Sequence, residues 1–173
     1  MRIAFLTDLH LGTPGQATQG VDVRRNFLNA LNYLTELKPD ALVIGGDVCY
    51  DMGQSETYRW FRERVEALSY PWYAIAGNHD DSVLMAGELG LEAHLHGEEF
   101  YFSEKLGEMS ALFLDTARGV CSETQWQWLG EKLANQEEAL IFMHHPPVLA
   151  GVGHMDTNYP FRGSEKFLEL TQP

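Results

Sequence analysis

The sequence predicts an α/β fold with a largely parallel sheet, because strand-length apolar runs alternate with longer amphipathic segments. The apolar runs Ile3–Leu6, Ala41–Ile44, Trp72–Ala76 and Ala139–Met143 are predicted to be buried strands. Between the first two, Val23–Leu37 repeats apolar residues at helical spacing and is predicted to be an amphipathic helix. Strands that are joined by a helix can pair in parallel, so a mostly parallel sheet is expected.

Capping and turn signals define the remaining elements. Ser55–Leu68 is predicted to be a second helix, with Ser55 as its N-cap. Glu99–Asp115 is predicted to be a hairpin that turns at a glycine. Ser122–Leu133 opens with S-E-T-Q, which is close to a capping box and predicts a third helix. Ser164–Leu170 is predicted to be a last helix.

The composition indicates a single domain over residues 1–173. Hydrophobic residues make up 45% of the chain and aromatic residues 12%, which is enough to bury a substantial core. A chain of 173 residues is most simply one domain. Because no apolar run approaches the ~20 residues that a membrane span needs, no membrane partner is expected.

The charge balance excludes further classes of partner. The chain has 12 Lys and Arg against 25 Asp and Glu, a formal charge of −13. Nucleic-acid polymers are bound by clustered basic side chains, so no such partner is expected. An acidic chain can still bind phosphate if metal ions supply positive charge locally. Cys49 and Cys121 allow at most one disulfide and the N-terminus lacks the pattern of a signal peptide, so a cytoplasmic location is expected.

Polar side chains follow four of the predicted strands at the point where each strand ends. The first strand is followed by T-D-L-H, the second by G-G-D, the third by A-G-N-H-D and the fourth by H-H-P-P. In open α/β sheets, ligands bind beyond the carboxyl ends of the strands, so these groups are expected to meet at one rim. The side chains that the motifs place there are Asp8, His10, Asp47, Asn78, His79, Asp80, His144 and His145.

These residue types suit divalent metal ions. Carboxylate oxygens and neutral imidazoles bind zinc, manganese or iron, and an asparagine carbonyl oxygen completes a mixed nitrogen and oxygen set. Two ions ~3.5–4 Å apart can clamp a phosphoryl group and lower the pKa of a water molecule. Each motif alone is also compatible with a turn or a helix cap. All four motifs in this order, each at the end of a strand, favour a metal site.

The four motifs, in this order and at these intervals, resemble those of the calcineurin-like metallophosphoesterases. The H-H-P-P form and the G-x-x-H-M-D segment after it are most similar to the branch of class III cyclic-nucleotide phosphodiesterases and glycerophosphodiesterases. The similarity runs from Arg2 to about Asp156. It implies an αββα metallophosphoesterase sandwich with two divalent metal ions, manganese, iron or zinc, at one rim.

The resemblance also implies roles for the rim residues. His79 would contact the phosphate and protonate the leaving group. Asp80 is expected to orient His79 or a neighbouring ligand, and His145 to lie behind the ligands or face the substrate. Arg118 is either a phosphate contact or an exposed loop residue. Asp8 and His10 would bind the first ion, and Asn78 and His144 would bind the second. Asp47 would bind both ions.

One part of the family pattern is missing from this sequence. The family pattern ends with a G-H-x-H motif that adds one histidine to each metal ion. Gly153–Asp156 starts like that motif but carries Asp156 in place of the second histidine. The sandwich is therefore expected to be incomplete at the C-terminus. Unpaired strand edges left in this way would favour association, most simply as a two-fold homodimer.

The leading hypothesis is a metal-dependent phosphoesterase that hydrolyses small phosphodiesters of the cyclic-nucleotide or glycerophosphodiester type. Two alternatives remain open. A metal-binding but catalytically weak or inactive homologue is compatible with the missing G-H-x-H motif, because three ligands can still hold a metal ion. A phosphomonoesterase would use the same rim with a different substrate pocket.

Overall fold

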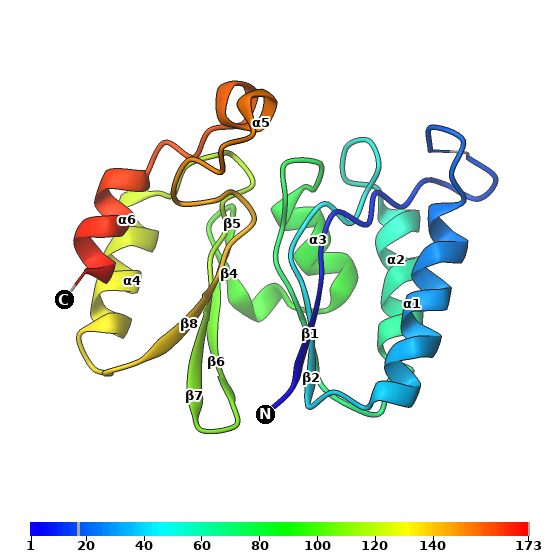
Figure 1. Cartoon of the computed structure of the whole chain (residues 1–173), viewed down its shortest axis with the longest axis horizontal. Helices are drawn as coiled ribbons and strands as arrows, with labels where there is room; N and C mark the ends of the chain where they lie inside the picture. The colour runs from blue at the N-terminus through cyan, green and yellow to red at the C-terminus, as the bar shows by residue number, and fades with distance from the viewer. Residues whose placement is uncertain (17, 173) are drawn as a thin grey trace.

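The computed structural model describes residues 1–16 and 18–172 and contains two three-stranded sheets that lie between layers of helices (Figure 1). In the first sheet, β1 (Ile3–Leu6), β2 (Ala41–Ile44) and β3 (Trp72–Ala74) pair in parallel in that order. This arrangement confirms the prediction of parallel strands connected by helices. The whole architecture is the αββα sandwich that the sequence predicts.

The second sheet combines a hairpin with a parallel strand. The strands β6 (Phe102–Leu106) and β7 (Met109–Phe113) are antiparallel, and β8 (Ala139–Phe142) pairs in parallel with β7. A separate two-residue pair, β4 (Leu95–His96) and β5 (Glu99–Phe100), precedes the hairpin. The predicted hairpin is therefore confirmed over Phe102–Phe113, with its turn at a glycine of positive φ, 61°, whereas Glu99–Phe100 pairs with β4 instead.

Helices cover the outer face of each sheet (Figure 1). The first sheet is covered by α1 (Val23–Leu37) and α2 (Ser55–Val65), and the second by α4 (Glu123–Leu133) and α6 (Ser164–Thr171). Ser122 caps α4 by accepting a hydrogen bond from the backbone N–H of Gln125, as its S-E-T-Q motif predicts.

Three shorter helices were not predicted from the sequence. The helix α3 (Ser82–Leu89) packs against α2, the 3₁₀ helix η1 (Glu92–His94) follows it, and α5 (Gly153–Asn158) lies in the connection from β8 to α6. Among the helices of the described residues, none combines the length and apolar character that crossing a bilayer would need.

Alternate residues of the central strands face opposite layers, because side chains of a strand point to opposite faces of a sheet. On β2, Ala41 and Val43 pack toward the second sheet, while Leu42 and Ile44 pack against α1 and α2. On β7, Ala111 and Phe113 face the first sheet, while Leu112 packs against α4 and α6. Both faces of both sheets are therefore apolar, as expected for sheets that are covered on both sides.

Two predicted boundaries were wrong. The helix α2 ends at Val65 rather than Leu68, and the chain then turns, with the backbone N–H of Leu68 donating to the carbonyl oxygen of Val65. Its N-cap is Gln54, without a side-chain hydrogen bond, so Ser55 is its first residue rather than its cap. The strand β3 ends at Ala74, although Ile75 is fully buried beyond it.

The strands β1, β2, β3 and β8 all run toward the same end of the sandwich (Figure 1). Three of them belong to the first sheet and β8 belongs to the second. The loops that follow these four strands therefore meet at one rim, across the junction of the two sheets.

Candidate metal centre

The rim loops bring together side chains from both sheets. Asp8 and His10 follow β1, Asp47 follows β2, Asn78 follows β3 and His144 follows β8. Three of these loops come from the first sheet, and only the fourth comes from the second. The site therefore depends on the packing of one sheet on the other.

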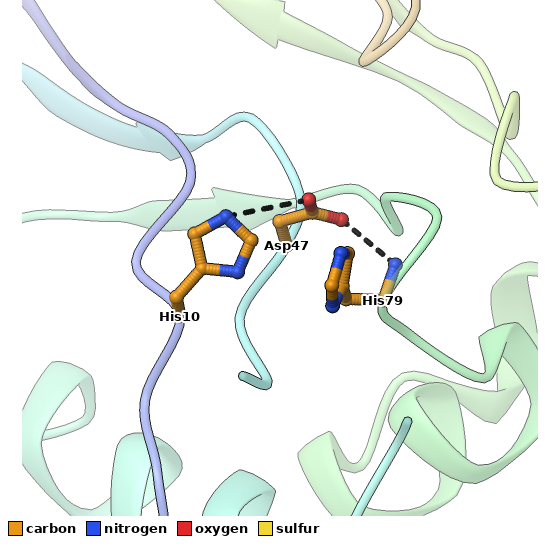
Figure 2. Close-up of side chains that lie close together, drawn as sticks. All are labelled: His10, Asp47 and His79. Carbon is orange, nitrogen blue, oxygen red and sulfur yellow. Dashed lines mark hydrogen bonds and ion pairs between the residues drawn. The ribbon is translucent and has the colours of Figure 1, made fainter. Parts of the chain in front are cut away.

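Asp47 lies at the centre of the cluster (Figure 2). Its side chain is only 4% exposed, and its two carboxylate oxygens face in different directions. Oδ2 lies 3.7 Å from Nε2 of His10, and Oδ1 lies 3.5 Å from Nε2 of His144. The backbone N–H of His79 donates a hydrogen bond of 2.9 Å to Oδ1. The carboxylate is thus held between two imidazoles.

Two overlapping groups of ligand atoms share Asp47. One group consists of His10, Asp47 and His79, and the other of Asp8, Asp47 and His144. Within each group, one potential ligand atom of every residue lies within 4.8 Å of the others. A carboxylate common to two such groups can bridge two cations.

The charges of the cluster favour cations. In the described part of the chain, the ion pairs of Asp8 and Asp47 involve only histidines, and no lysine or arginine pairs with either carboxylate. A buried carboxylate without a cationic partner is costly. The buried side chain of Asp47, with the half-exposed carboxylate of Asp8 beside it, therefore fits a site that divalent metal ions neutralise.

His144 adds a second indication of a cation. Its Nδ1 lies 2.7 Å from the carbonyl oxygen of Gly45, which can only accept, so Nδ1 carries the proton. Nε2 then faces Oδ1 of Asn78 at 3.3 Å and Oδ1 of Asp47 at 3.5 Å. In a neutral imidazole this places a lone pair beside two oxygen acceptors. A cation among the three atoms removes the repulsion.

His79 is oriented by two backbone carbonyls. Its Nδ1 lies 2.6 Å from the oxygen of Tyr50 and 3.1 Å from the oxygen of Asp51, so Nδ1 donates a proton to them. The ring meets His10 edge to face, with 4.8 Å between the ring centroids. Proton exchange or metal coordination by His79 therefore falls to Nε2.

The ligand loops adopt a strained backbone conformation. Asp8, His10 and Asp47 have φ values of 54°, 45° and 52°, in the left-handed region that residues other than glycine rarely adopt. Such conformations cost of order 1–3 kcal/mol each and cluster at functional sites. The packing of the loops thus fixes the ligands at a cost in stability.

Glycines allow the loops to approach each other, and the sequence analysis missed their role. A Cβ on Gly46 would lie 2.6 Å from Nδ1 of His144, and a Cβ on Gly77 would collide with the carboxylate of Asp47. The signal was present in the motifs G-G-D and A-G-N-H-D, in which these glycines precede the polar residues.

Among the hydrogen bonds of the described residues, those of the Asp80 carboxylate go to partners other than the ring of His79. Asp80 is buried and connects the loops after β2 and β3. Burial raises the pKa of its carboxyl group, and the hydrogen bonds that it accepts oppose that rise. The donors are the backbone N–H groups of Gly77, Val48 and Cys49 and the hydroxyl group of Tyr58.

We predict that Asp80→Ala lowers the free energy of unfolding by about 3 kcal/mol or more, because each buried donor left without a partner costs about 1–3 kcal/mol. The matched control is Asp81→Ala, which removes the N-cap of α3 and should cost about 1 kcal/mol. Urea unfolding of the two variants measures the difference. Equal losses of stability would contradict the bridging role of Asp80.

His145 lies next to His144, is 4% exposed and lines the cavity beside the cluster. Its backbone N–H donates to the hydroxyl group of Thr116 at 3.1 Å, and its ring meets the ring of His144 at 84°. Burial, and secondarily the neighbouring His144, lower the pKa of His145. Its side chain therefore favours the neutral imidazole.

An apolar cavity of about 260 Å³ lies beside the cluster. Asn78 and His144 line one end of it. The rest of the wall comes from the H-H-P-P loop and the segment that carries α5 and α6, including Leu149, Met155 and Phe161. The cavity is close to the lower limit of typical small-molecule sites.

Comparison with known proteins relates the chain to phosphoesterases. The family model described as "Calcineurin-like phosphoesterase" matches residues 1–171. A probable cyclic nucleotide phosphodiesterase of Fibrobacter succinogenes is 33% identical over 163 residues, which cover 94% of this chain and 63% of the relative. A probable glycerophosphodiester phosphodiesterase, GpdQ, of Arcobacter nitrofigilis is 29% identical, with coverage of 98% and 66%.

The chain thus spans less than two thirds of the length of these two relatives. The 3',5'-cyclic adenosine monophosphate phosphodiesterase CpdA of Escherichia coli K12 is 28% identical, over 90% of this chain and 59% of that protein. Among solved structures, a dimetal phosphatase from Danio rerio superposes with a TM-score of 0.68 at 13% identity, covering 97% of this chain and 76% of that one. This last similarity supports the fold alone.

Proposed function

Because the chain belongs to the calcineurin-like phosphoesterase family, we propose that it is a metal-dependent hydrolase of small phosphodiesters. The observation that carries this proposal is the buried carboxylate of Asp47 between two imidazoles, in a cluster to which both sheets contribute. The names of its relatives, cyclic nucleotide and glycerophosphodiester phosphodiesterases, support diesters as the substrate class.

We assign the metal ligands as the resemblance implies, and two contacts support this pairing: Nε2 of His10 lies 3.8 Å from Oδ1 of Asp8, and Nε2 of His144 lies 3.3 Å from Oδ1 of Asn78. Asp8 and His10 would hold one ion, Asn78 and His144 the other, and Asp47 both. Carboxylate, imidazole and amide ligands accept manganese, iron or zinc. When bound, two such ions polarise the phosphoryl group and lower the pKa of a water molecule.

His79 supplies the proton for the leaving group. Nδ1 keeps its proton for the carbonyl oxygens of Tyr50 and Asp51, so the proton that His79 transfers is a second one, bound at Nε2 of the imidazolium form. As water adds to phosphorus and the ester P–O bond breaks, Nε2 protonates the departing oxygen and later regains a proton from solvent. His145 packs its ring against that of His144 and lines the cavity beside the cluster, so it would support a ligand and face the substrate.

The cavity beside Asn78 and His144 favours a small substrate. Its volume of about 260 Å³ leaves room for the organic group of a small diester, and its wall is mostly apolar. A polymeric substrate would need a long basic groove instead. The segment that carries α5 therefore contributes to substrate binding in this proposal.

We predict that the manganese-loaded chain hydrolyses bis(para-nitrophenyl) phosphate and that a chelator lowers the rate by about 10²-fold or more, since bound ions supply several kcal/mol of transition-state stabilisation. Added manganese should restore the rate. Release of para-nitrophenolate measures both steps. A chain that binds metal tightly but hydrolyses no ester would instead be the inactive homologue, and faster turnover of para-nitrophenyl phosphate would indicate a phosphomonoesterase.

The proposal also includes a cellular compartment and an oligomeric state. Both cysteines are buried free thiols, which fits a reducing compartment such as the cytoplasm. A two-fold homodimer stays a prediction. Light scattering that gives the mass of a single chain would contradict it.

A further inference from the structure

A second cavity, of about 230 Å³, adjoins the apolar one. Asn78, His145, Tyr159 and Pro160 line both cavities, so the two meet beside Asn78, one of the proposed metal ligands. The charged side chains that line the second cavity are those of Arg118 and Arg162. Two guanidinium groups beside a metal centre are unexpected in a chain with a formal charge of −13.

The two arginines are held on neighbouring segments that hydrogen-bond to each other. The backbone N–H of Arg162 donates to the carbonyl oxygen of Gly119 at 2.9 Å, and Nη2 of Arg162 donates to the carbonyl oxygen of Arg118 at 3.1 Å. Asp115 stabilises the turn that carries Arg118. That buried carboxylate accepts the backbone N–H groups of Ala117 and Phe100.

Both positive charges are available to a ligand. Arg118 pairs with Glu98 at 2.8 Å, but the side chains are 66% and 71% exposed, and exposed pairs contribute little. Arg162 forms no ion pair within the described residues. A guanidinium has five N–H donors, so the bond from Arg162 to a carbonyl leaves others free.

We infer that Arg118 and Arg162 form a subsite for a second phosphoryl group of the substrate, next to the phosphoryl group that is hydrolysed. The inference rests on the proposed function for the position of the scissile group. Guanidinium groups bind phosphate oxygens through paired hydrogen bonds, and two of them match the two negative charges of a terminal phosphate. The preferred substrate is then a phosphodiester that also carries a phosphate group.

A matched pair of substrates tests this inference. Both are thymidine whose five-prime phosphate carries a para-nitrophenyl ester, and one of them bears a further phosphate on the three-prime oxygen. The wild-type chain with manganese should prefer the second substrate in kcat/KM. Arg162→Ala or Arg118→Ala should reduce this preference by about 10- to 100-fold, the factor expected for losing a charge-assisted hydrogen bond. Arg162→Lys should retain part of it, because the charge stays but the paired geometry is lost.

The control variant is Arg59→Ala, which removes an equally exposed arginine of α2 that pairs with Glu88 and does not line the cavity. Its substrate preference should equal that of the wild type. If Arg118→Ala and Arg162→Ala also retain the wild-type preference, the inference is wrong.

Binding separates this inference from the proposed function. In the presence of chelator, calorimetry should show that the wild type binds thymidine bisphosphate more tightly than thymidine monophosphate, and that Arg162→Ala loses this difference. That result with no turnover of either ester would sustain the subsite and reject the hydrolase. Turnover of both esters without any effect of the arginine variants on preference or binding would reject the subsite alone.

Discussion

Asp47→Asn is expected to reduce phosphodiester hydrolysis by about 10³-fold and to lower the metal content of the chain. The several kcal/mol that bound ions supply correspond to such a factor, since about 1.4 kcal/mol is tenfold in rate. The substitution removes the negative charge of the buried side chain whose two carboxylate oxygens face His10 and His144. Steady-state kinetics and elemental analysis of the purified variant measure the two effects.

The backbone should tolerate this change. Asp47 has a φ of 52°, a conformation that asparagine adopts more readily than most residues. The control is Asp22→Asn at the N-cap of α1, where asparagine caps as well as aspartate does. If Asp47→Asn retained both the wild-type rate and the wild-type metal content, Asp47 would not bridge two ions.

His79→Asn is expected to lower kcat by about 10²–10⁴-fold while leaving the metal content unchanged, because a positioned proton donor contributes a factor of this size. Asparagine can still donate a hydrogen bond toward the carbonyl oxygen of Tyr50, but it lacks the atom that replaces Nε2. The variant therefore removes proton transfer with little change in the loop.

The leaving group gives the sharper measurement for His79. An alkyl diester leaves as a basic alkoxide that needs a proton, whereas para-nitrophenolate leaves readily without one. The loss of kcat in His79→Asn should be larger for the alkyl diester. Because His79 also lies within 4.8 Å of ligand atoms of His10 and Asp47, loss of metal in this variant would show that His79 is a ligand instead.

Much of the fold could be predicted because local pattern and burial agree. The bounds of β1, α1 and β2 match the predicted ranges, since strand-length apolar runs and a strong helical period each have one interpretation. The helix α3 was missed because its sequence, S-V-L-M-A-G-E-L, is apolar on more than one face and shows no clear period. Ile75 shows a different limit of the prediction. Its side chain is buried as its apolar character predicts, but apolar character alone does not determine whether a residue belongs to a strand.

The rim could be anticipated because parallel strands end at the same edge of a sheet. The direction of individual side chains could not. The chain after Asn78 makes a turn in which the backbone N–H of Asp80 donates to Gly77, and this turn directs the carboxylate toward the interior. Of the two expected partners of Asp80, the hydrogen bonds favour the loops that carry Asp47 and Asn78 over the ring of His79. The pairing of Arg162 with the turn at Arg118 depends on contacts between distant segments, which no local pattern encodes.

The central claim is that the rim holds two ions with Asp47 between them. Anomalous diffraction from crystals of the chain grown with manganese tests it most directly. Two anomalous peaks are expected about 3.5–4 Å apart, on opposite sides of the Asp47 carboxylate. One should lie beside His10 and the other beside His144. A map with no peak within coordination distance of Asp47, or with manganese bound only elsewhere on the chain, would contradict it.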